Sequence, residues 1–146
     1  MNLPTYMTST VQAQAYRLLR EHVYAVLTQY DLTPSYWSML GVILESRDGV
    51  RQVEIARAMH VKAPLITAMT KQMEDRNIVQ SVQNQFDARA KLLAITPSGR
   101  KFMKQVEIDL NARLKLLLVG LNEADLQAYQ KVLTTIVANN ATMPKQ

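Results

Sequence analysis

Residues 52–95, QVEIARAMHVKAPLITAMTKQMEDRNIVQSVQNQFDARAKLLAI, decide the fold of this 146-residue chain. Their first part, residues 52–59, has apolar side chains at helical spacing and predicts a helix of barely two turns. After a link over residues 60–63, Pro64 suits the first position of a second helix, which extends to Arg76 with an inward stripe of Ile66, Met69 and Met73. Two short helices joined by a tight turn are therefore expected.

A β-hairpin is expected directly after the second helix. Asn77 stands where the chain must leave that helix, and asparagine readily takes the left-handed conformation that ends one. Residues 78–83 alternate apolar and polar, residues 84–88 supply a loop, and residues 91–95 are a second run of β-branched and aliphatic side chains. This order predicts a helix-turn-helix over residues 52–76 and a wing over residues 78–95, and the second helix of such a pair fits the major groove of DNA.

Amphipathic helices are expected on both sides of this unit. Apolar residues recur every three or four positions from Thr8 to Tyr30, with residues 8–10 as cap candidates. Thr33 and Pro34 are an N-cap and a first helical residue for a helix that ends near Ser46. On the far side, a helix restarts at Pro97 and its apolar stripe continues to Leu121, after which Asn122 caps a last helix.

The predicted fold class is therefore mainly α with a small β-hairpin, namely a winged helix-turn-helix with long N- and C-terminal dimerisation helices. We expect a single domain over residues 1–146, with the winged lobe at 34–97 and the dimerisation helices at 8–31 and 98–140. The terminal apolar stripes need a cover, and a two-fold dimer would supply it while setting two recognition helices about 34 Å apart.

Charge and composition favour a nucleic-acid partner over catalysis. The chain carries a net charge of +5, whereas residues 51–104 alone carry ten basic against four acidic residues, a net +6. Cysteine is absent, and His22 and His60 lie far apart, so neither a metal nor a cofactor is expected. With four glycines and no nucleotide-binding or nucleophile motif, the sequence does not indicate an enzyme. It also lacks an apolar run of membrane length, and a soluble, cytoplasmic protein is expected.

Several motifs resemble those of the MarR (multiple antibiotic resistance regulator) transcriptional regulators, especially the SlyA-like branch. Residues 32–37, LTPSYW, are similar to the opening of the family's second helix, and residues 54–56 with 69–74 resemble its helix-turn-helix. Residues 87–91, DARAK, followed by residues 95–99, ITPSG, resemble its wing and the restart of the next helix. The resemblance implies a dimeric regulator that reads a pseudo-palindromic operator through residues 63–76 and the wing.

The resemblance also implies roles for particular residues. Arg89 at the wing tip would enter the minor groove, Asp87 would orient it, and residues 62–72 would face the major groove. The expected DNA-binding residues are Gln52, Lys62, Pro64, Thr67, Ala68, Lys71, Gln72, Asp87, Arg89 and Lys91. Family members commonly carry arginine where this chain has Ala68, Ser81 and Ala88, and each lost phosphate contact lowers the salt dependence of binding by about one counterion.

Many proteins of this family bind small aromatic or amphipathic ligands between the dimer helices and the DNA-binding lobe. Apolar walls with one cation would hold an aromatic acid, and the candidate lining is Tyr16, Arg17, Trp37, Leu40 and Met59. The alternative is that Trp37 and Met59 belong to the core and Arg17 is a surface charge. A second alternative concerns the whole protein, which could be a winged-helix protein that binds a protein or a ligand without DNA.

Overall fold

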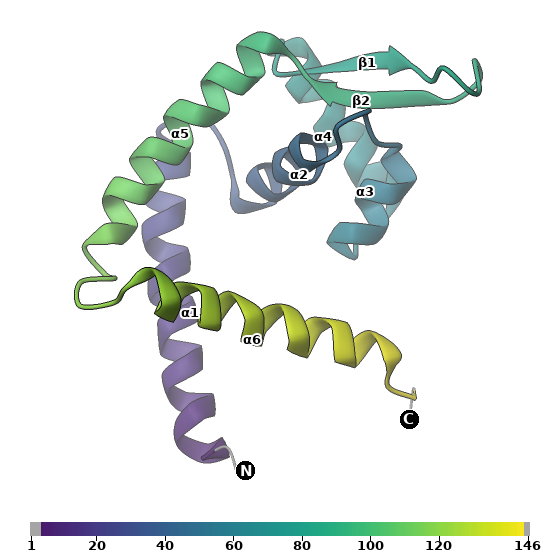
Figure 1. Cartoon of the computed structure of the whole chain (residues 1–146). Coiled ribbons are helices and arrows are strands. Elements are labelled where there is room, and N and C mark those ends of the chain that lie inside the picture. The colour runs from purple at the N-terminus through teal and green to yellow at the C-terminus, as the bar shows by residue number, and fades with distance from the viewer. Residues whose placement is uncertain (1–3, 145–146) are drawn as a thin grey trace. The chain divides into compact units, whose positions relative to one another are not determined.

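The computed structural model describes residues 4–144, which fold into six helices and two strands (Figure 1). The elements are α1 Thr5–Thr28, α2 Pro34–Glu45, α3 Gln52–Met59, α4 Ala63–Asp75, β1 Val79–Gln83, β2 Lys91–Ile95, α5 Pro97–Lys115 and α6 Glu123–Thr142. The two strands pair antiparallel, so the predicted class of a mainly helical protein with one small hairpin is confirmed. Packing divides the chain after Leu114 into two units, which are described separately.

The first unit has one apolar core, to which the second half of α1 and all of α2 to α5 contribute. Its fully buried side chains include Leu27 of α1, Leu40 of α2, Ile55 of α3 and Ile66 of α4. The hairpin joins this core through alternate residues of β2, since Leu93 and Ile95 are buried while Leu92 and Ala94 are only half-buried. The winged lobe is thus a folded body that holds α4 and the hairpin in fixed positions.

Several of the local signals for helix starts and stops are confirmed. The Thr33 hydroxyl accepts a hydrogen bond from the backbone N–H of Tyr36 and caps α2, and Pro34 follows it. The predicted bounds of α3 agree with the structure. Asn77 takes the left-handed conformation with φ 56°, and the hairpin begins two residues later. Each of these features depends on side chains only a few residues apart.

Three predicted details were wrong. The first helix begins at Thr5 after Pro4, so residues 8–10 lie inside it, and the hydroxyls of Ser9 and Thr10 bond back to carbonyls one turn earlier instead of capping. Helix α4 begins at Ala63, which makes Pro64 its second residue. Helix α5 ends at Lys115 although its apolar spacing continues, because residues 116–121 turn and Gly120 adopts φ 91°.

A tight turn between α2 and α3 supports the base of the wing. Gly49 adopts φ 89°, and the next residue, Val50, exchanges two backbone hydrogen bonds with Leu93 of β2. This isolated bridge joins the turn to the hairpin, whose register pairs Val79 with Ile95 and Gln83 with Lys91. Beyond this support the hairpin projects from the helices and ends in a free tip (Figure 1).

The second unit is residues 115–146, within which α6 is the one helix the structure describes. Asn122 caps it as predicted, because its side chain accepts from the N–H of Asp125 while the Asp125 carboxylate accepts from the N–H of Asn122. None of its side chains is buried. Across residues 4–144, no helix combines the length and the apolar character that a membrane crossing requires.

Candidate nucleic-acid interface

Helices α3 and α4 form a helix-turn-helix because the turn between them is fixed by backbone conformation. His60 is left-handed, with φ 54°, and ends α3, and the N–H of Val61 then bonds to the carbonyl of Ala56. Lys62 is extended and stands at the N-cap of α4. The chain therefore reverses within three residues, which leaves α4 packed across α3.

Helix α4 has one buried face and one exposed face. Ile66, Met69 and Met73 are buried, as predicted, together with the hydroxyl of Thr70. The opposite face is exposed and carries the predicted DNA-binding residues of this helix, which are Pro64, Thr67, Ala68, Lys71 and Gln72. A helix anchored in this way presents polar side chains on a rigid support, as base and phosphate contacts require.

Hydrogen bonds within the lobe hold the exposed side chains of α4. The Thr67 hydroxyl donates to the side-chain carbonyl of Gln52 at 2.8 Å, which joins α3 to α4. The Tyr36 hydroxyl of α2 donates to the side-chain carbonyl of Gln72, so the amide N–H₂ group of Gln72 remains available as a donor. Lys71 pairs with Asp75 at 3.3 Å, but both groups are largely exposed, so this ion pair is weak. A phosphate can therefore replace Asp75 as the partner of Lys71.

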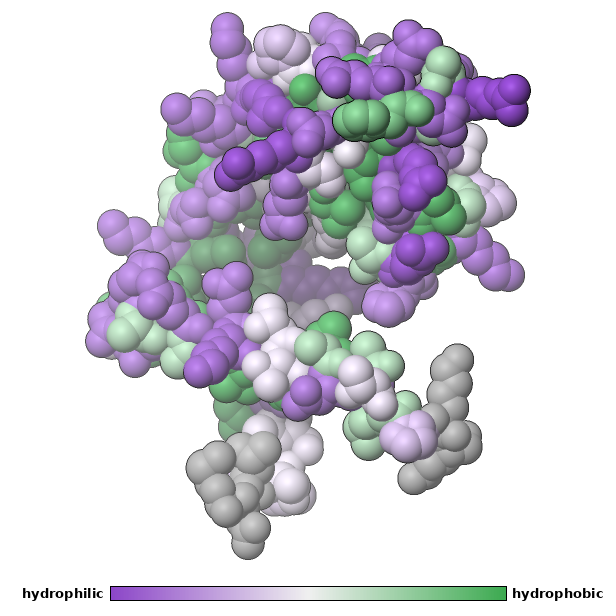
Figure 2. All heavy atoms as spheres, turned by 45° about the vertical axis from the view of Figure 1, so that its right-hand side comes forward, coloured by the Kyte–Doolittle hydropathy of each residue, from purple (hydrophilic) through white to green (hydrophobic). Residues whose placement is uncertain are grey.

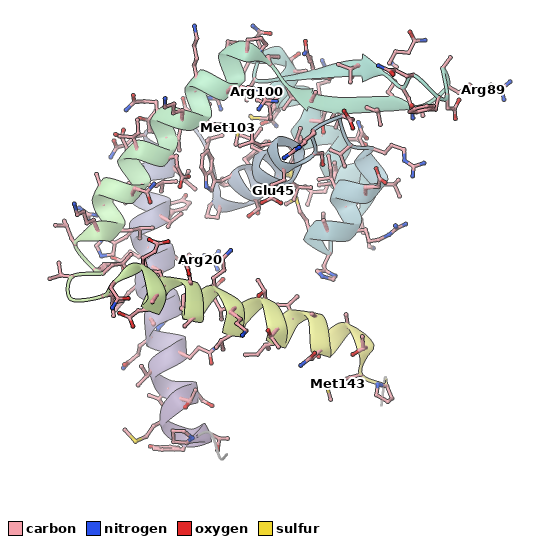
Figure 3. All side chains as sticks on the ribbon, viewed as in Figure 1. Arg20, Glu45, Arg89, Arg100, Met103 and Met143 are labelled. Atoms are coloured by element: carbon pink, nitrogen blue, oxygen red, sulfur yellow. The ribbon has the colours of Figure 1, made fainter. Side chains whose placement is uncertain are left out.

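The wing carries the second group of predicted residues. Arg89 lies at the far tip of the hairpin, and its side chain points away from the helices (Figure 3). Asp87 accepts from the backbone N–H of Arg89 at 2.9 Å, so it shapes the loop, and among residues 4–144 no ion pair joins its carboxylate to the Arg89 guanidinium. Lys91 is exposed at the start of β2. Polar side chains cover most of the face of this lobe seen in Figure 2.

The three positions without arginine are all exposed, and one of them, Ser81, takes part in a local hydrogen bond. Ala68 lies on the outward face of α4, and Ala88 lies in the wing loop. The Ser81 hydroxyl on β1 donates to the Glu74 carboxylate at 2.7 Å, which ties the hairpin to α4. A serine here thus replaces a positive charge with a bond inside the lobe.

The five predicted ligand-binding residues do not share one cavity. Tyr16 and Met59 line an open hollow of about 580 Å³ between α1, α2 and α3. Leu40 is fully buried in the core, and Trp37 lines a different hollow of about 400 Å³, between α2 and α5, with Arg100 and Met103 (Figure 3). Arg17 does not line the hollow beside Tyr16, because it lies on another face of α1.

The cation of that first hollow is Arg20, which sequence reasoning missed. It stands four residues after Tyr16 and one after Leu19, and all three line the hollow with Val23. This is the i, i+3, i+4, i+7 spacing of a single helical face, so the sequence contained the signal. Arg20 lines the hollow together with apolar residues that include Val42 and Val61, a combination suited to an aromatic anion.

A cluster around Arg76 joins the end of α4 to α1 and α5. The Arg76 guanidinium donates to the carbonyls of Tyr30 and Asp31 at 2.9 and 3.1 Å and lies 5.3 Å from the ring centre of Phe102. Tyr30 packs edge-to-face on Phe102, and its hydroxyl donates to Asp109. This hydrogen bond, with burial and the negative charge of Asp109, raises the pKa of Tyr30. The orientation of α4 is thereby coupled to the helices that lead out of the lobe.

Comparison with known proteins identifies the same fold elsewhere. A family model described as "MarR family" matches residues 32–91, which include α2, the helix-turn-helix and most of the wing. AbsC, a MarR family transcriptional regulator from Streptomyces coelicolor, superposes with a TM-score of 0.77 at 20% identity, over 98% of this chain and 99% of that one. The winged-helix fold of the MarR proteins is thus established for this chain.

Two further structures show the fold with a bound partner. The MepR–DNA complex from S. aureus matches at TM-score 0.65 and 19% identity, over 95% of this chain and 99% of MepR. CouR from Rhodococcus jostii RHA1, bound to p-coumaroyl-CoA, matches at 0.73 and 22%, over 90% of both chains. These structural matches establish the winged-helix fold and do not distinguish the SlyA-like branch.

Proposed function

We propose that this chain, which has the MarR winged-helix fold, is a transcriptional regulator that binds duplex DNA as a homodimer and is not an enzyme. The observation that carries the proposal is the two-faced character of α4, whose apolar side is buried while Thr67, Lys71 and Gln72 are exposed on a rigid support. The basic charge concentrated in residues 51–104 supplies attraction to phosphates. MepR provides a precedent for DNA binding by this fold.

The contact surface follows from these placements. Residues 63–76 enter the major groove with Thr67, Lys71 and Gln72 toward base edges and phosphates, and Gln52, Lys62 and Pro64 lie near the backbone. In the wing, Arg89 enters the minor groove, Lys91 contacts phosphate and Asp87 sets the loop. A two-fold dimer presents this surface twice, about 34 Å apart, to the half-sites of a pseudo-palindromic operator.

Dimerisation is proposed because apolar side chains of the terminal helices are uncovered within each unit. In α1, Val26 and Leu27 are the buried residues, while Val11, Tyr16 and Leu18 are more than half exposed. In α6, Val132, Ile136 and Val137 are similarly exposed and nothing is buried. A second copy of the chain would cover these residues, so residues 8–31 and 98–140 serve as dimerisation helices of one functional domain.

The hollow beside Arg20 is the proposed ligand site. It takes an aromatic or amphipathic anion, with the guanidinium of Arg20 near the charge and Tyr16, Leu19 and Met59 as walls. A ligand seated between α1 and the helix-turn-helix would shift the lobe against the dimer helices and release the operator. CouR, bound to p-coumaroyl-CoA, is a MarR-like structure that holds an aromatic acyl thioester.

Fluorescence anisotropy of a labelled duplex from beside the coding region of this protein, titrated at several salt concentrations, tests DNA binding. We expect Arg89→Ala to weaken binding and to lower the slope of log K against log [salt] by about one. Arg17→Ala is the matched control, because it removes an exposed positive charge outside the proposed surface, and it should change neither value. Failure of the wild type to bind duplex at low salt would reject the proposal.

Oligomeric state is tested independently by light scattering on a sizing column. Ile136→Glu should shift the protein from dimer to monomer, because it places a charge on the uncovered face of α6. Val53→Glu is the control, since Val53 is similarly exposed on α3 and lies outside the dimer helices. A monomeric wild type at micromolar concentration would contradict the assignment of α1 and α6.

The alternative function, a winged-helix protein that binds a protein or ligand without DNA, is favoured by one observation. Ala68, Ser81 and Ala88 supply no charge where related proteins commonly have arginine. Retention on heparin or duplex DNA at low salt distinguishes the two functions, because the alternative predicts none.

A further inference from the structure

The aromatic ring of Phe86, in the wing loop, is almost wholly exposed to water. Its side chain is 97% exposed, and no other large apolar residue within residues 4–144 is as exposed. The second phenylalanine of the chain, Phe102, behaves in the ordinary way and packs against Tyr30 and the core. The exposed ring leaves apolar surface in water, and burying it against a partner would be favourable.

The wing loop holds Phe86 and Arg89 in one ordered turn. The Asn84 side chain accepts from the N–H of Phe86, and the Asp87 side chain accepts from the N–H of Arg89, each at 2.9 Å. The N–H of Ala90 bonds to the carbonyl of Asp87 at 3.0 Å, and the N–H of Asn84 closes the loop on Ala90. The aromatic ring and the cation therefore project from a backbone that is already shaped before any partner binds.

We propose that Phe86 is a second DNA contact of the wing, a role that rests on the proposed function. Its ring inserts at the minor groove beside Arg89 and packs against deoxyribose and the edges of bases. Proteins that enter the minor groove combine arginine with apolar wedges such as phenylalanine, and the groove, about 6 Å wide, admits a ring edge-on. DNA fits better than a protein partner because Arg89 and Lys91, two exposed cations, flank the same loop.

A contact between Phe86 and DNA would add affinity to a wing that has no positive charge at position 88. Ala88 lies between Phe86 and Arg89 and cannot neutralise a phosphate. An aromatic contact contributes through apolar burial and stacking, which release no counterions. The contribution of Arg89 to DNA affinity then falls as the salt concentration rises, whereas the contribution of Phe86 does not depend on salt.

The test uses the full-length protein and the salt-titrated anisotropy assay with Phe86→Ala, Phe86→Leu and Arg89→Ala. We expect Phe86→Ala to weaken binding by about tenfold at every salt concentration, with the slope against log [salt] unchanged. Phe86→Leu should lose less, because it keeps apolar volume. Arg89→Ala should lower the slope by about one. Gln85→Ala, on the same loop, is the control and should bind as the wild type does.

Folding of the variants is checked by thermal unfolding. Phe86→Ala should have the melting temperature of the wild type, because the Phe86 ring is exposed and does not pack in the core. If wild type and Phe86→Ala bind equally, the role of Phe86 is refuted while the proposed function stands. A change in salt slope for Phe86→Ala would also refute it, since the ring would then act by positioning Arg89. If the wild type binds no duplex at low salt, the proposed function fails, and the role of Phe86 fails with it.

Discussion

Gly99 in the first turn of α5 should be the least replaceable glycine of the chain. It lies where α5 starts against the beginning of the hairpin, with its N–H bonded to the Thr96 hydroxyl at 2.8 Å. A Cβ on this residue would lie 2.2 Å from the carbonyl oxygen of Ile78 and 2.9 Å from a methyl group of Ile95. Since Cβ atoms essentially never approach within 3.0 Å of a non-bonded heavy atom, α5 and the start of the hairpin must separate.

The size of the effect follows from that separation. The Ile78 carbonyl also accepts from the N–H of Thr96 at 3.0 Å, so moving it strains a buried hydrogen bond as well as the packing. Overpacking costs about 1–3 kcal/mol and a weakened hydrogen bond about 1 kcal/mol, so Gly99→Ala should lower the free energy of unfolding by about 3 kcal/mol. For a chain of this size the melting temperature should fall by about 9 °C.

The matched control is the same substitution at Gly41. This residue is inside α2, and no atom lies within 4 Å of a Cβ placed there. Alanine in a helix interior is better than glycine by about 0.5–1 kcal/mol, so Gly41→Ala should raise the melting temperature by about 2 °C. Thermal unfolding followed by circular dichroism at one protein concentration measures both. A Gly99→Ala protein that melts at or above the wild-type temperature would refute the steric argument.

Three further substitutions test other parts of the lobe. Gly49→Ala should destabilise the base of the wing by about 1–3 kcal/mol, because φ is 89° and the new Cβ would lie 2.8 Å from the Cβ of Leu92. Faster amide exchange at Val50 and Leu93 would show this destabilisation, and unchanged exchange would contradict it. Arg76→Ala should lower the free energy of unfolding by about 1–2 kcal/mol through loss of the carbonyl and Phe102 contacts, whereas Arg100→Ala should have little effect; equal denaturant midpoints for the two variants would count against the cluster. The backbone N–H of Arg51, followed by its side chain, lowers the pKa of Glu54, so the charged carboxylate stabilises α3 above the ordinary carboxyl pKa and loses that effect as pH falls through the lowered value. Glu54→Gln should therefore melt below the wild type at neutral pH and approach it in acid, and a difference that is independent of pH would exclude this role.

The sequence predicted the elements of the winged lobe because their signals are local. Thr33, Pro34 and Asn77 act on the backbone within one turn, and the bounds of α3 and the hairpin strands followed from periodicity. The outward face of α4 was predictable for the same reason, since burying Ile66, Met69 and Met73 exposes the opposite residues. Local signals failed where the same pattern fits both a helix and a turn. In α5, for example, the apolar spacing continues past the end of the helix at Lys115.

The members of a site were less predictable, because packing between distant elements selects them. Tyr16, Arg17 and Arg20 all lie on α1. Tyr16 and Arg20 share a hollow because α2 and α3 pack beside that face of α1, whereas Arg17 lies on another face. Leu40 and Trp37 lie three residues apart on α2. Leu40 is buried in the core, whereas Trp37 lines a separate hollow.

By itself, then, the sequence determined the order of elements, the turns and the basic surface, since these depend on neighbours along the chain. Tertiary structure alone decided which cation faces the hollow, that Ser81 bonds to Glu74, and that Phe86 remains in water, since each depends on what other elements place beside that residue.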